Sequence, residues 1–396
     1  MEFAFTEEQL MIRDTAESFL KEVSTSEAIR TAMATDAGFD ADLWKTICTD
    51  LYWQAIHIPE EFGGMGLGYV ELVAMMEQMG RFLLCSPFFS TVCLGANALI
   101  IAGTEEQKAL YLPQICEGKT ATLAYTGLSA ARSGGQWGAQ TIDVVATSSG
   151  DEFVLNGTVR FVPDGASADI LVIAARTAGS VGRDGVSLFV IPSDTAGVQR
   201  TLLKTMDQTR KQAEIVLDNV TVSASALMSK EGEAWTELST VIDLATVALA
   251  AEQMGGAQQI MDMTVEYTKE RTQFNRPIAG FQAIKHMAAD MMTRVEVARS
   301  GVYYAACVAQ DAFDLAATGN TDGEFSAELP EAASIAKSYC SDTYFKNAGD
   351  SIQMHGGVGF TWEYDVHLHF KRAKATEHQL GNGAYHRERI ASLLLD

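Results

Sequence analysis

Cationic and amide side chains gather at one point of an otherwise acidic sequence. Residues 269–288 show a pattern in which a helix ends, a turn with proline and glycine follows, and another helix begins. The ends of these helices carry Arg271, Arg276, Lys285 and His286. Such a group of cations suits an anionic ligand. The same residues could equally form a structural corner of salt bridges, and the sequence leaves both interpretations open.

A second segment that could bind a ligand is glycine-rich and lies near the end of the chain. Residues 353–359 read Gln-Met-His-Gly-Gly-Val-Gly and follow a helical pattern. Glycines leave backbone N–H groups unshielded by side chains, as a bound phosphate or sugar would need. Glycine is also the preferred residue just after a helix, so this segment alone indicates little.

The composition limits the partners of the protein. Its 396 residues carry a formal net charge of −22, which repels nucleic-acid phosphates and anionic lipids. We therefore expect neither nucleic acid nor a membrane as partner, and any anionic ligand must be held by a local basic cluster. The six cysteines are scattered without CxxC spacing, which argues against a zinc site and a disulfide framework. We expect no metal and mostly structural, reduced thiols.

Hydrophobicity and the first residues predict where the chain resides. Residues 94–102 and 241–251 are the longest apolar runs, and they are too short or too interrupted to cross a bilayer. The first ten residues lack the basic region and cleavage site of a secretory signal. We therefore expect a cytoplasmic protein.

Three regions of different periodicity must position the two segments. From Thr6, which resembles a helix N-cap, to about residue 117 the apolar residues recur at helical spacing. Between about 121 and 226, short β-rich runs alternate with polar and glycine clusters, and the Asn156-Gly157 pair predicts a hairpin turn. Helical patterns return at 233–268, 279–311, 330–349 and 384–395, and 316–328 reads as a surface loop.

In combination, these features resemble the acyl-CoA dehydrogenase family. The resemblance rests on residues 269–288 and 353–359 in this order, on Pro-Glu-Glu-Phe-Gly-Gly-Met-Gly at 59–66, and on the opening Phe-Thr-Glu-Glu-Gln-Leu. It covers essentially the whole chain. It implies an α+β fold with an N-terminal helical domain (1–120), a central β-barrel-like domain (121–226) and a C-terminal four-helix bundle (227–396).

The resemblance also implies FAD, a CoA thioester substrate, and a dimer of dimers in which each flavin lies across a subunit interface. An electron-transferring flavoprotein is the implied electron acceptor. In that arrangement, one set of residues reaches the diphosphate and adenosine of the flavin bound mainly by the neighbouring subunit. This chain keeps the whole set: Arg271, Phe274, Gln282, Gln353, Gly356 and Gly357.

The half of the flavin site that the family builds from the β-domain is poorly kept. Only Thr126 matches the usual Thr-Glu-Pro and Gly-Ser-Asp run, and Phe161-Val162-Pro163 replaces the usual Trp-Ile-Thr or Trp-Ile-Ser. Proline has neither a hydroxyl nor an N–H, so a flavin seated here would lose a donor at its reactive nitrogen. Alternatively, these are ordinary substitutions and the cofactor binds by other contacts.

A catalytic base is missing from both positions that the family uses. Removal of the α-proton of an acyl-CoA requires a carboxylate or another proton acceptor, but those positions hold Leu380 and Ala245. On the helix that carries Ala245, Asp243 is expected to point away, and Glu252 lies about 10 Å further along the axis. His378 and His386 flank Leu380 and could substitute for the base, but we expect both at the surface.

These losses favour a subunit of a heteromeric acyl-CoA dehydrogenase, in which a sister subunit supplies the base and the main flavin seat. The ending Leu-Gly-Asn-Gly-Ala-Tyr-His-Arg-Glu-Arg at 380–389 resembles the α2β2 steroid side-chain enzymes. The alternatives are a homotetrameric enzyme with a displaced base such as Glu252, and a non-catalytic structural or ligand-binding member of the fold.

Overall fold

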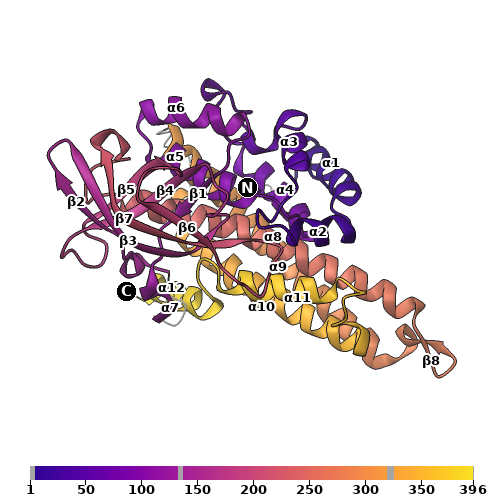
Figure 1. Cartoon of the computed structure of the whole chain (residues 1–396). Helices are drawn as coiled ribbons and strands as arrows, with labels where there is room; N and C mark the ends of the chain where they lie inside the picture. Colours follow the sequence, from indigo (N-terminus) through magenta and orange to yellow (C-terminus); the bar gives the residue numbers. More distant parts are fainter. Residues whose placement is uncertain (1–4, 133–136, 319–324, 396) are drawn as a thin grey trace.

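The computed structural model describes residues 5–132, 137–318 and 325–395. A β-sheet region lies at one side of the molecule, with N-terminal helices beside it and long C-terminal helices beneath both (Figure 1). These long helices extend away from the sheet to a tip that carries the short strand β8 (Thr272–Gln273). The expected order of helical, β and helical regions is therefore confirmed.

In the described part of the chain, four of the six N-terminal helices begin at a threonine or aspartate N-cap, and the cap predicted at Thr6 is confirmed. Thr6 closes a capping box: its hydroxyl accepts a hydrogen bond from the Gln9 N–H, and the Gln9 side chain accepts one from the Thr6 N–H. The helices are α1 (Glu7–Val23), α2 (Ser26–Met33), α3 (Ala41–Thr49), α4 (Tyr69–Arg81), α5 (Asn97–Ala102) and α6 (Glu105–Cys116). A π-helical segment, Phe89–Ala96, precedes α5 and is wholly buried.

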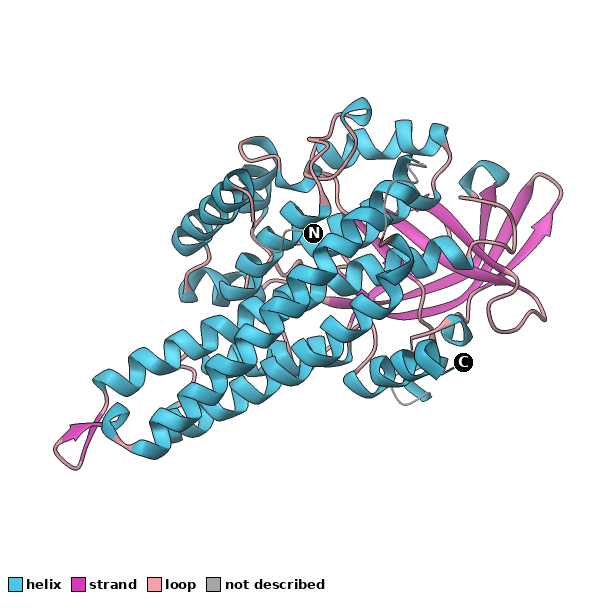
Figure 2. Ribbon diagram, turned by 180° about the vertical axis from the view of Figure 1, so that it is seen from behind, coloured by secondary structure: helices cyan, strands magenta, loops and turns pink. Residues whose placement is uncertain are grey.

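The central region is a mixed, curled sheet. Its strands are β1 (Ala121–Ala124), β2 (Val145–Ser149), β3 (Glu152–Pro163), β4 (Ile170–Thr177), β5 (Val186–Pro192), β6 (Val198–Leu202) and β7 (Gln212–Ser223). They pair in the order β1-β4-β2-β3-β7-β6, and β5 pairs with β4. Figure 2 shows this sheet beside the helical bundle.

The predicted hairpin at Asn156-Gly157 is wrong. Both residues lie within β3, and the turn between β2 and β3 falls at residues 150–151 instead. The register of β3 against β7 shifts between Leu155 and Gly157, which marks a β-bulge. A Cβ on Gly157 would lie 2.8 Å from the Val144 Cα, so glycine permits close approach of two backbones rather than a turn.

The C-terminal region contains two helices of more than 35 residues. The bundle consists of α8 (Trp235–Glu270), α9 (Gln282–Thr318), α10 (Leu329–His355), α11 (Val366–His378) and α12 (Gly383–Leu395). Helix α11 has no counterpart among the predicted helices, because its apolar and polar positions are mixed around the helix. No helix among the described residues is both long and apolar enough to span a membrane.

Paired glycines allow α8 to pack closely against two neighbouring helices. A Cβ on Gly255 would collide with the Glu77 carbonyl on α4, and one on Gly256 would collide with the Tyr344 ring on α10. These glycines weaken the isolated helix but are required by its packing. They let α8 lie in the main hydrophobic core between α4 of the N-terminal region and α10 of the C-terminal region.

Candidate cofactor and substrate site

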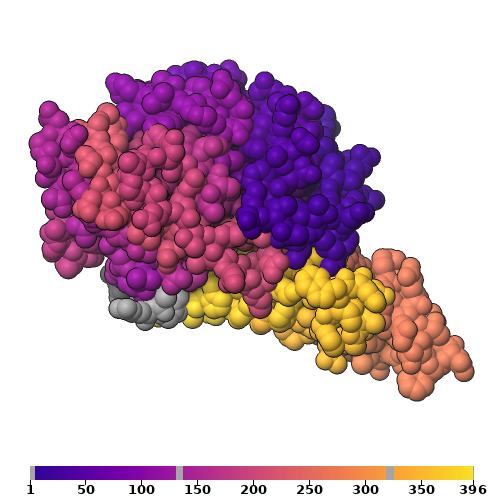
Figure 3. All heavy atoms as spheres, viewed as in Figure 1, coloured from indigo at the N-terminus to yellow at the C-terminus, as the bar shows by residue number. Residues whose placement is uncertain are grey.

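The cationic segment forms an exposed tip at the end of the α8–α9 hairpin. Helix α8 ends at Glu270, and β8 and β9 (Arg276–Pro277) make a two-stranded turn with positive φ at Phe274 and Asn275. The Phe274 side chain is 87% exposed, and Arg271 and Gln282 are exposed as well. In the space-filling view of Figure 3 this tip projects from the body of the molecule.

The alternative of a salt-bridge corner at this tip is wrong. Within the described residues, the cations Arg271, Arg276, Lys285 and His286 make no ion pair. Arg276 instead lies over the Phe281 ring, with its guanidinium carbon 4.0 Å from the ring centroid. The tip therefore presents a positive charge that the chain itself does not neutralise.

The glycine-rich turn lies at the same end of the bundle. Helix α10 ends at His355, whose ring stacks on Tyr267 of α8 with centroids 4.1 Å apart, and whose carbonyl accepts a hydrogen bond from the Tyr267 hydroxyl. Gln353, in the last turn of α10, and Gly356 and Gly357, just after it, are exposed. A Cβ on either glycine would meet no atom within 4 Å. Tertiary packing thus brings the two predicted cofactor-binding segments to one end of the molecule.

The β-domain, which carries the flavin positions Thr126 and Phe161 to Pro163, lies far from this tip, across the length of the bundle (Figure 1). Phe161 has φ +58° at a register shift in β3, and the Pro163 carbonyl accepts a hydrogen bond from the Thr122 hydroxyl. The Thr126 hydroxyl is buried and donates to the Arg160 carbonyl at 3.1 Å, so the sheet uses its hydrogen. One ligand cannot contact both the tip and this part of the same chain.

Two cavities flank the turn that follows α11. The first, about 610 Å³, lies between Phe161, residues 204–212 and the end of α11; we call it the β-domain cavity. The second, about 600 Å³, lies between the starts of α8 and α12, at Trp235, Asp243 and Tyr385; we call it the α12 cavity. Trp137 borders both cavities.

The turn between these cavities is held rigidly but carries no acid or base. Leu380 is buried with φ +59°, a backbone conformation that is unusual for leucine. The ammonium of Lys337 donates hydrogen bonds to the carbonyls of Thr376, Glu377 and Gly381 at 3.0–3.1 Å. The backbone of this turn is therefore fixed by a fully buried lysine, whose pKa burial lowers to about 7.

The two histidines beside Leu380 differ in their environments. His378 is exposed at the edge of the β-domain cavity, as expected. The expectation that His386 lies at the surface is wrong: it is buried, with Nε2 3.0 Å from the Leu380 carbonyl. Burial lowers its pKa to about 3, so His386 is a neutral structural residue. No local pattern predicts this burial, because His386 lies on α12 and packs against Ser334 of α10 only in the folded chain.

The carboxylates of α8 are held in ion pairs. Ala245 is fully buried in the core. Asp243 borders the α12 cavity, but both of its oxygens accept hydrogen bonds from the Arg389 guanidinium. Both carboxylate oxygens of Asp243 are therefore already engaged by one guanidinium group.

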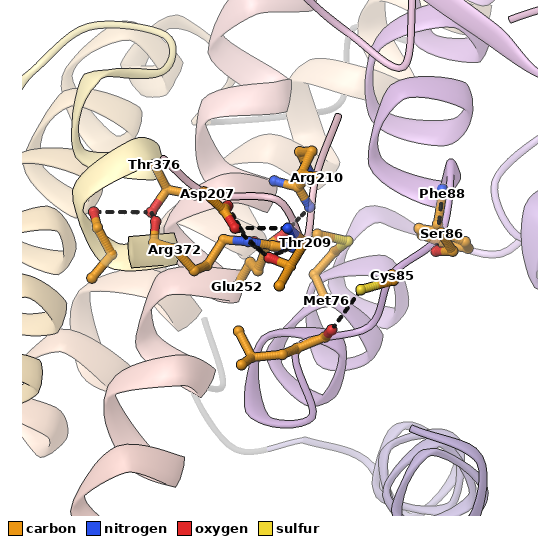
Figure 4. Close-up of polar contacts among 12 residues, drawn as sticks. Met76, Cys85, Ser86, Phe88, Asp207, Thr209, Arg210, Glu252, Arg372 and Thr376 are labelled. Carbon is orange, nitrogen blue, oxygen red and sulfur yellow. Dashed lines mark hydrogen bonds and ion pairs between the residues drawn. The ribbon is translucent and has the colours of Figure 1, made fainter. Parts of the chain in front are cut away.

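Glu252, the proposed displaced base, lies inside a buried ionic network (Figure 4). Its Oε1 accepts a hydrogen bond from Arg372 at 2.8 Å, and its Oε2 accepts one from Arg210. Burial opposes ionisation, but the two guanidinium groups outweigh it and lower the pKa of this carboxyl. Glu252 is therefore an ion-pair partner, and the interpretation of this residue as a displaced base is not supported. No sequence pattern linked Glu252 to Arg210 and Arg372, which lie 42 and 120 residues away.

Metal chemistry has no visible site in the described ranges. No cluster there holds three or more His, Cys, Asp or Glu side chains in reach of one ion. The cysteines are free thiols, and burial raises the pKa of Cys48, Cys85 and Cys340 to about 12. These three thiols are uncharged at neutral pH and fill the core.

Comparisons with known proteins agree along the whole chain. Residues 6–119, 127–220 and 234–395 match the N-terminal, middle and C-terminal domains of acyl-CoA dehydrogenase. An acyl-CoA dehydrogenase of Bacillus subtilis (strain 168) is 31% identical over 395 residues, 98% of each chain.

Two solved structures of paired proteins are also similar. The ChsE4-ChsE5 complex from Mycobacterium tuberculosis has a chain that is 26% identical, with TM-score 0.85 and coverage of 100% and 99%. A variant of the steroid ACAD Tcur3481-Tcur3483 is 28% identical, with TM-score 0.82 and coverage of 98% of each chain. With its three domains matched in order and its full length covered by a relative, this chain belongs to the acyl-CoA dehydrogenase family.

Proposed function

We propose that this chain is one subunit of a heteromeric, FAD-dependent acyl-CoA dehydrogenase that introduces an α,β double bond into a CoA thioester. It contributes contacts in trans to a flavin seated mainly on a sister subunit, which also supplies the base. One observation carries this proposal. The exposed, unneutralised tip at Arg271 lies across the bundle from the β-domain, whose own flavin position at Pro163 lacks a donor. In the helical region, the two base positions Leu380 and Ala245 lack a proton acceptor.

FAD fits the residues at the tip. The Arg271 guanidinium is free to bind a diphosphate through paired hydrogen bonds. The exposed Phe274 ring offers a face for a base or sugar, and the unshielded backbone at Gly356 and Gly357 can approach a phosphate or ribose closely. Gln282, exposed at the start of α9, and Gln353 add amide groups. The flavin supplies the hydride acceptor for the reaction.

The state of this chain's carboxylates explains why a sister subunit is needed. Dehydrogenation transfers the α-proton to a base and the β-hydrogen, with its electron pair, to the flavin. Leu380 and Ala245 cannot accept a proton, and Asp243 and Glu252 are held by arginines. We therefore propose that a sister subunit supplies the base. The likeness to the ChsE4-ChsE5 complex supports a paired assembly.

The substrate is proposed to carry a bulky acyl group, such as a steroid side chain. The α12 cavity has a volume of about 600 Å³ and includes Trp137, Trp235 and Tyr385 on its walls. Large aromatic surfaces suit a rigid, apolar ring system. The likeness to the steroid ACAD Tcur3481-Tcur3483 supports this class. An electron-transferring flavoprotein is proposed as the acceptor, as the resemblance to the family implies.

Purification with and without a sister chain tests the proposal. The chain expressed alone should be colourless, and co-expression with a sister acyl-CoA dehydrogenase chain, sought among the products of neighbouring genes, should yield a yellow complex. Adding a steroid side-chain acyl-CoA should then bleach the flavin absorbance. Isolated chain that is yellow and bleaches with an acyl-CoA would show a self-sufficient enzyme and overturn the proposal.

A further inference from the structure

The β-domain cavity remains open even though the flavin contacts around it are lost. Its volume is about 610 Å³, within the range of small-molecule sites. Aromatic rings of Phe161 and Trp137 form part of its wall, and apolar contributions come from Met206 and Ala375. A cavity of this size with aromatic walls suits a planar ring.

Buried donors without partners border the same cavity. Arg210 is 8% exposed, and its Nη1 has no hydrogen-bond partner; Gln379 is 3% exposed, and its Nε2 has none either. Lys204, at the cavity edge, is exposed and makes no ion pair within the described parts of the chain. Buried donors without partners are costly, and a bound acceptor is one way to satisfy them.

The buried ionic network of Figure 4 fixes Arg210 in place and occupies the nearby acceptors. The Arg210 Nη2 is bound by Glu252, and its guanidinium lies over the Phe89 ring at 4.7 Å. Asp207, which also borders the cavity, accepts hydrogen bonds from the Thr209 hydroxyl at 2.6 Å and from Arg372 at 2.9 Å. The cavity wall therefore offers the buried donors of Arg210 and Gln379 to a ligand. The buried carboxylate of Asp207 already accepts hydrogen bonds from other residues of this chain.

From this geometry we infer that the β-domain cavity binds a planar aromatic anion of nucleotide class that is not a flavin. The ring lies against Phe161 and Trp137, and the anionic group accepts hydrogen bonds from Arg210, Gln379 and Lys204. The inference rests on the proposed function, in which the flavin is seated mainly on the sister subunit. Pro163 offers no N–H, and the Thr126 hydroxyl already donates to the Arg160 carbonyl, so two donors that a flavin would use here are unavailable.

Calorimetric titration of the yellow heteromeric complex with AMP tests the inference, with adenosine as the uncharged probe. AMP should bind, and adenosine should bind at least about tenfold more weakly, because it lacks the charge-assisted hydrogen bonds. The variants Lys204→Gln and Gln379→Leu in this chain should each weaken AMP binding several-fold. Lys230→Gln, which changes an exposed lysine that does not line the cavity, is the matched control and should leave binding unchanged.

Three results would overturn the inference: no heat from AMP at millimolar concentration, equal affinity for AMP and adenosine, or affinity that neither cavity variant alters. Release of FAD by AMP that is sensitive to Lys204→Gln would also overturn it, because the cavity would then be a flavin seat. Failure of AMP binding in a complex that stays yellow and active leaves the proposed function standing. Flavin bound by this chain alone would instead contradict the proposed function.

Discussion

The Nζ atom of Lys337 lies 3.0 Å from the carbonyl oxygen of Gly381, inside the protein and 44 residues away along the chain. The same ammonium also donates to the carbonyls of Thr376 and Glu377 and to the Ser341 hydroxyl. These bonds hold the turn that contains Leu380, the position at which the resemblance to the family leads us to expect a base. The backbone of this turn is thus firmly supported, although the side chain at its centre is a hydrocarbon.

Replacing Lys337 with methionine should lower the free energy of unfolding by about 2 kcal/mol or more, because several buried carbonyls lose their donor. Urea denaturation of the complex and of the isolated chain measures the change. Lys346→Met, which removes an exposed lysine of the same helix, is the control and should cost at most about 0.5 kcal/mol. Equal losses in both variants would contradict a supporting role for Lys337.

The contribution of Lys337 to stability should rise with pH. Burial lowers its pKa from 10.5 to about 7, so between these values the unfolded chain binds more protons than the folded chain. The free energy of unfolding of the wild type, relative to that of Lys337→Met, should therefore increase from pH 7 to pH 10. Urea denaturation of both proteins at several pH values measures this difference. A difference that stays constant or falls would show that the lysine is not deprotonated in the folded state.

Replacing Leu380 with alanine should reduce stability but leave chemistry intact. Loss of a buried leucine costs about 2–3 kcal/mol, whereas turnover per folded complex should stay within about twofold, because Leu380 transfers no proton. Denaturation and acyl-CoA-dependent dye reduction measure the two effects. Leu393→Ala, at a half-exposed leucine of α12, controls for apolar truncation. A hundredfold loss of turnover in Leu380→Ala would show that this chain contributes to the reacting centre.

Replacing Arg271 with alanine should weaken flavin retention by the complex. Loss of charge-assisted hydrogen bonds to a diphosphate costs about 1.5–3 kcal/mol, a tenfold to hundredfold increase in the flavin Kd. Stability of the isolated chain should not change, because no described residue pairs with Arg271. Flavin content after gel filtration measures retention, and Lys269→Ala, an exposed cation paired with Glu266, is the control. Unchanged flavin content in Arg271→Ala would contradict the proposal that Arg271 contacts the flavin of the sister subunit.

Replacing Glu252 with glutamine should destabilise the fold by about 3 kcal/mol at neutral pH, because two buried arginines lose their counter-charge. Its pKa is lowered in the folded state, so the stabilising contribution is present above the unfolded value near 4.5 and is lost as the pH falls below it. Asp342→Asn, in an exposed ion pair with Arg387, should cost less than about 1 kcal/mol.

The kinetics of Glu252→Gln distinguish a structural role of Glu252 from a role as the catalytic base. The pH profile of turnover by folded Glu252→Gln complex should match that of the wild type, because Glu252 takes no proton from the substrate. Loss of turnover with unchanged stability would mean that Glu252 is the base after all. That result would restore the interpretation of the chain as a self-sufficient enzyme.

Local patterns predicted those features that depend on near neighbours in the chain. The N-cap at Thr6 and the break between α8 and α9 follow from residue types within one or two turns of helix. The hairpin at Asn156-Gly157 failed because pairing of β3 with β7 used the glycine for a bulge and a close backbone approach. Tertiary pairing decides between these uses of the same dipeptide.

The absence of a proton acceptor at Leu380 and Ala245 was determined by the sequence alone, because no fold can give a hydrocarbon side chain a basic atom. Only the tertiary structure decided that Glu252 is neutralised by Arg210 and Arg372, since burial and distance set the charge balance of a carboxylate. The tertiary structure also placed the Arg271 tip across the bundle from the β-domain. That separation depends on how α8 and α9 pack along their lengths. The residue types of the two helices do not by themselves determine this packing.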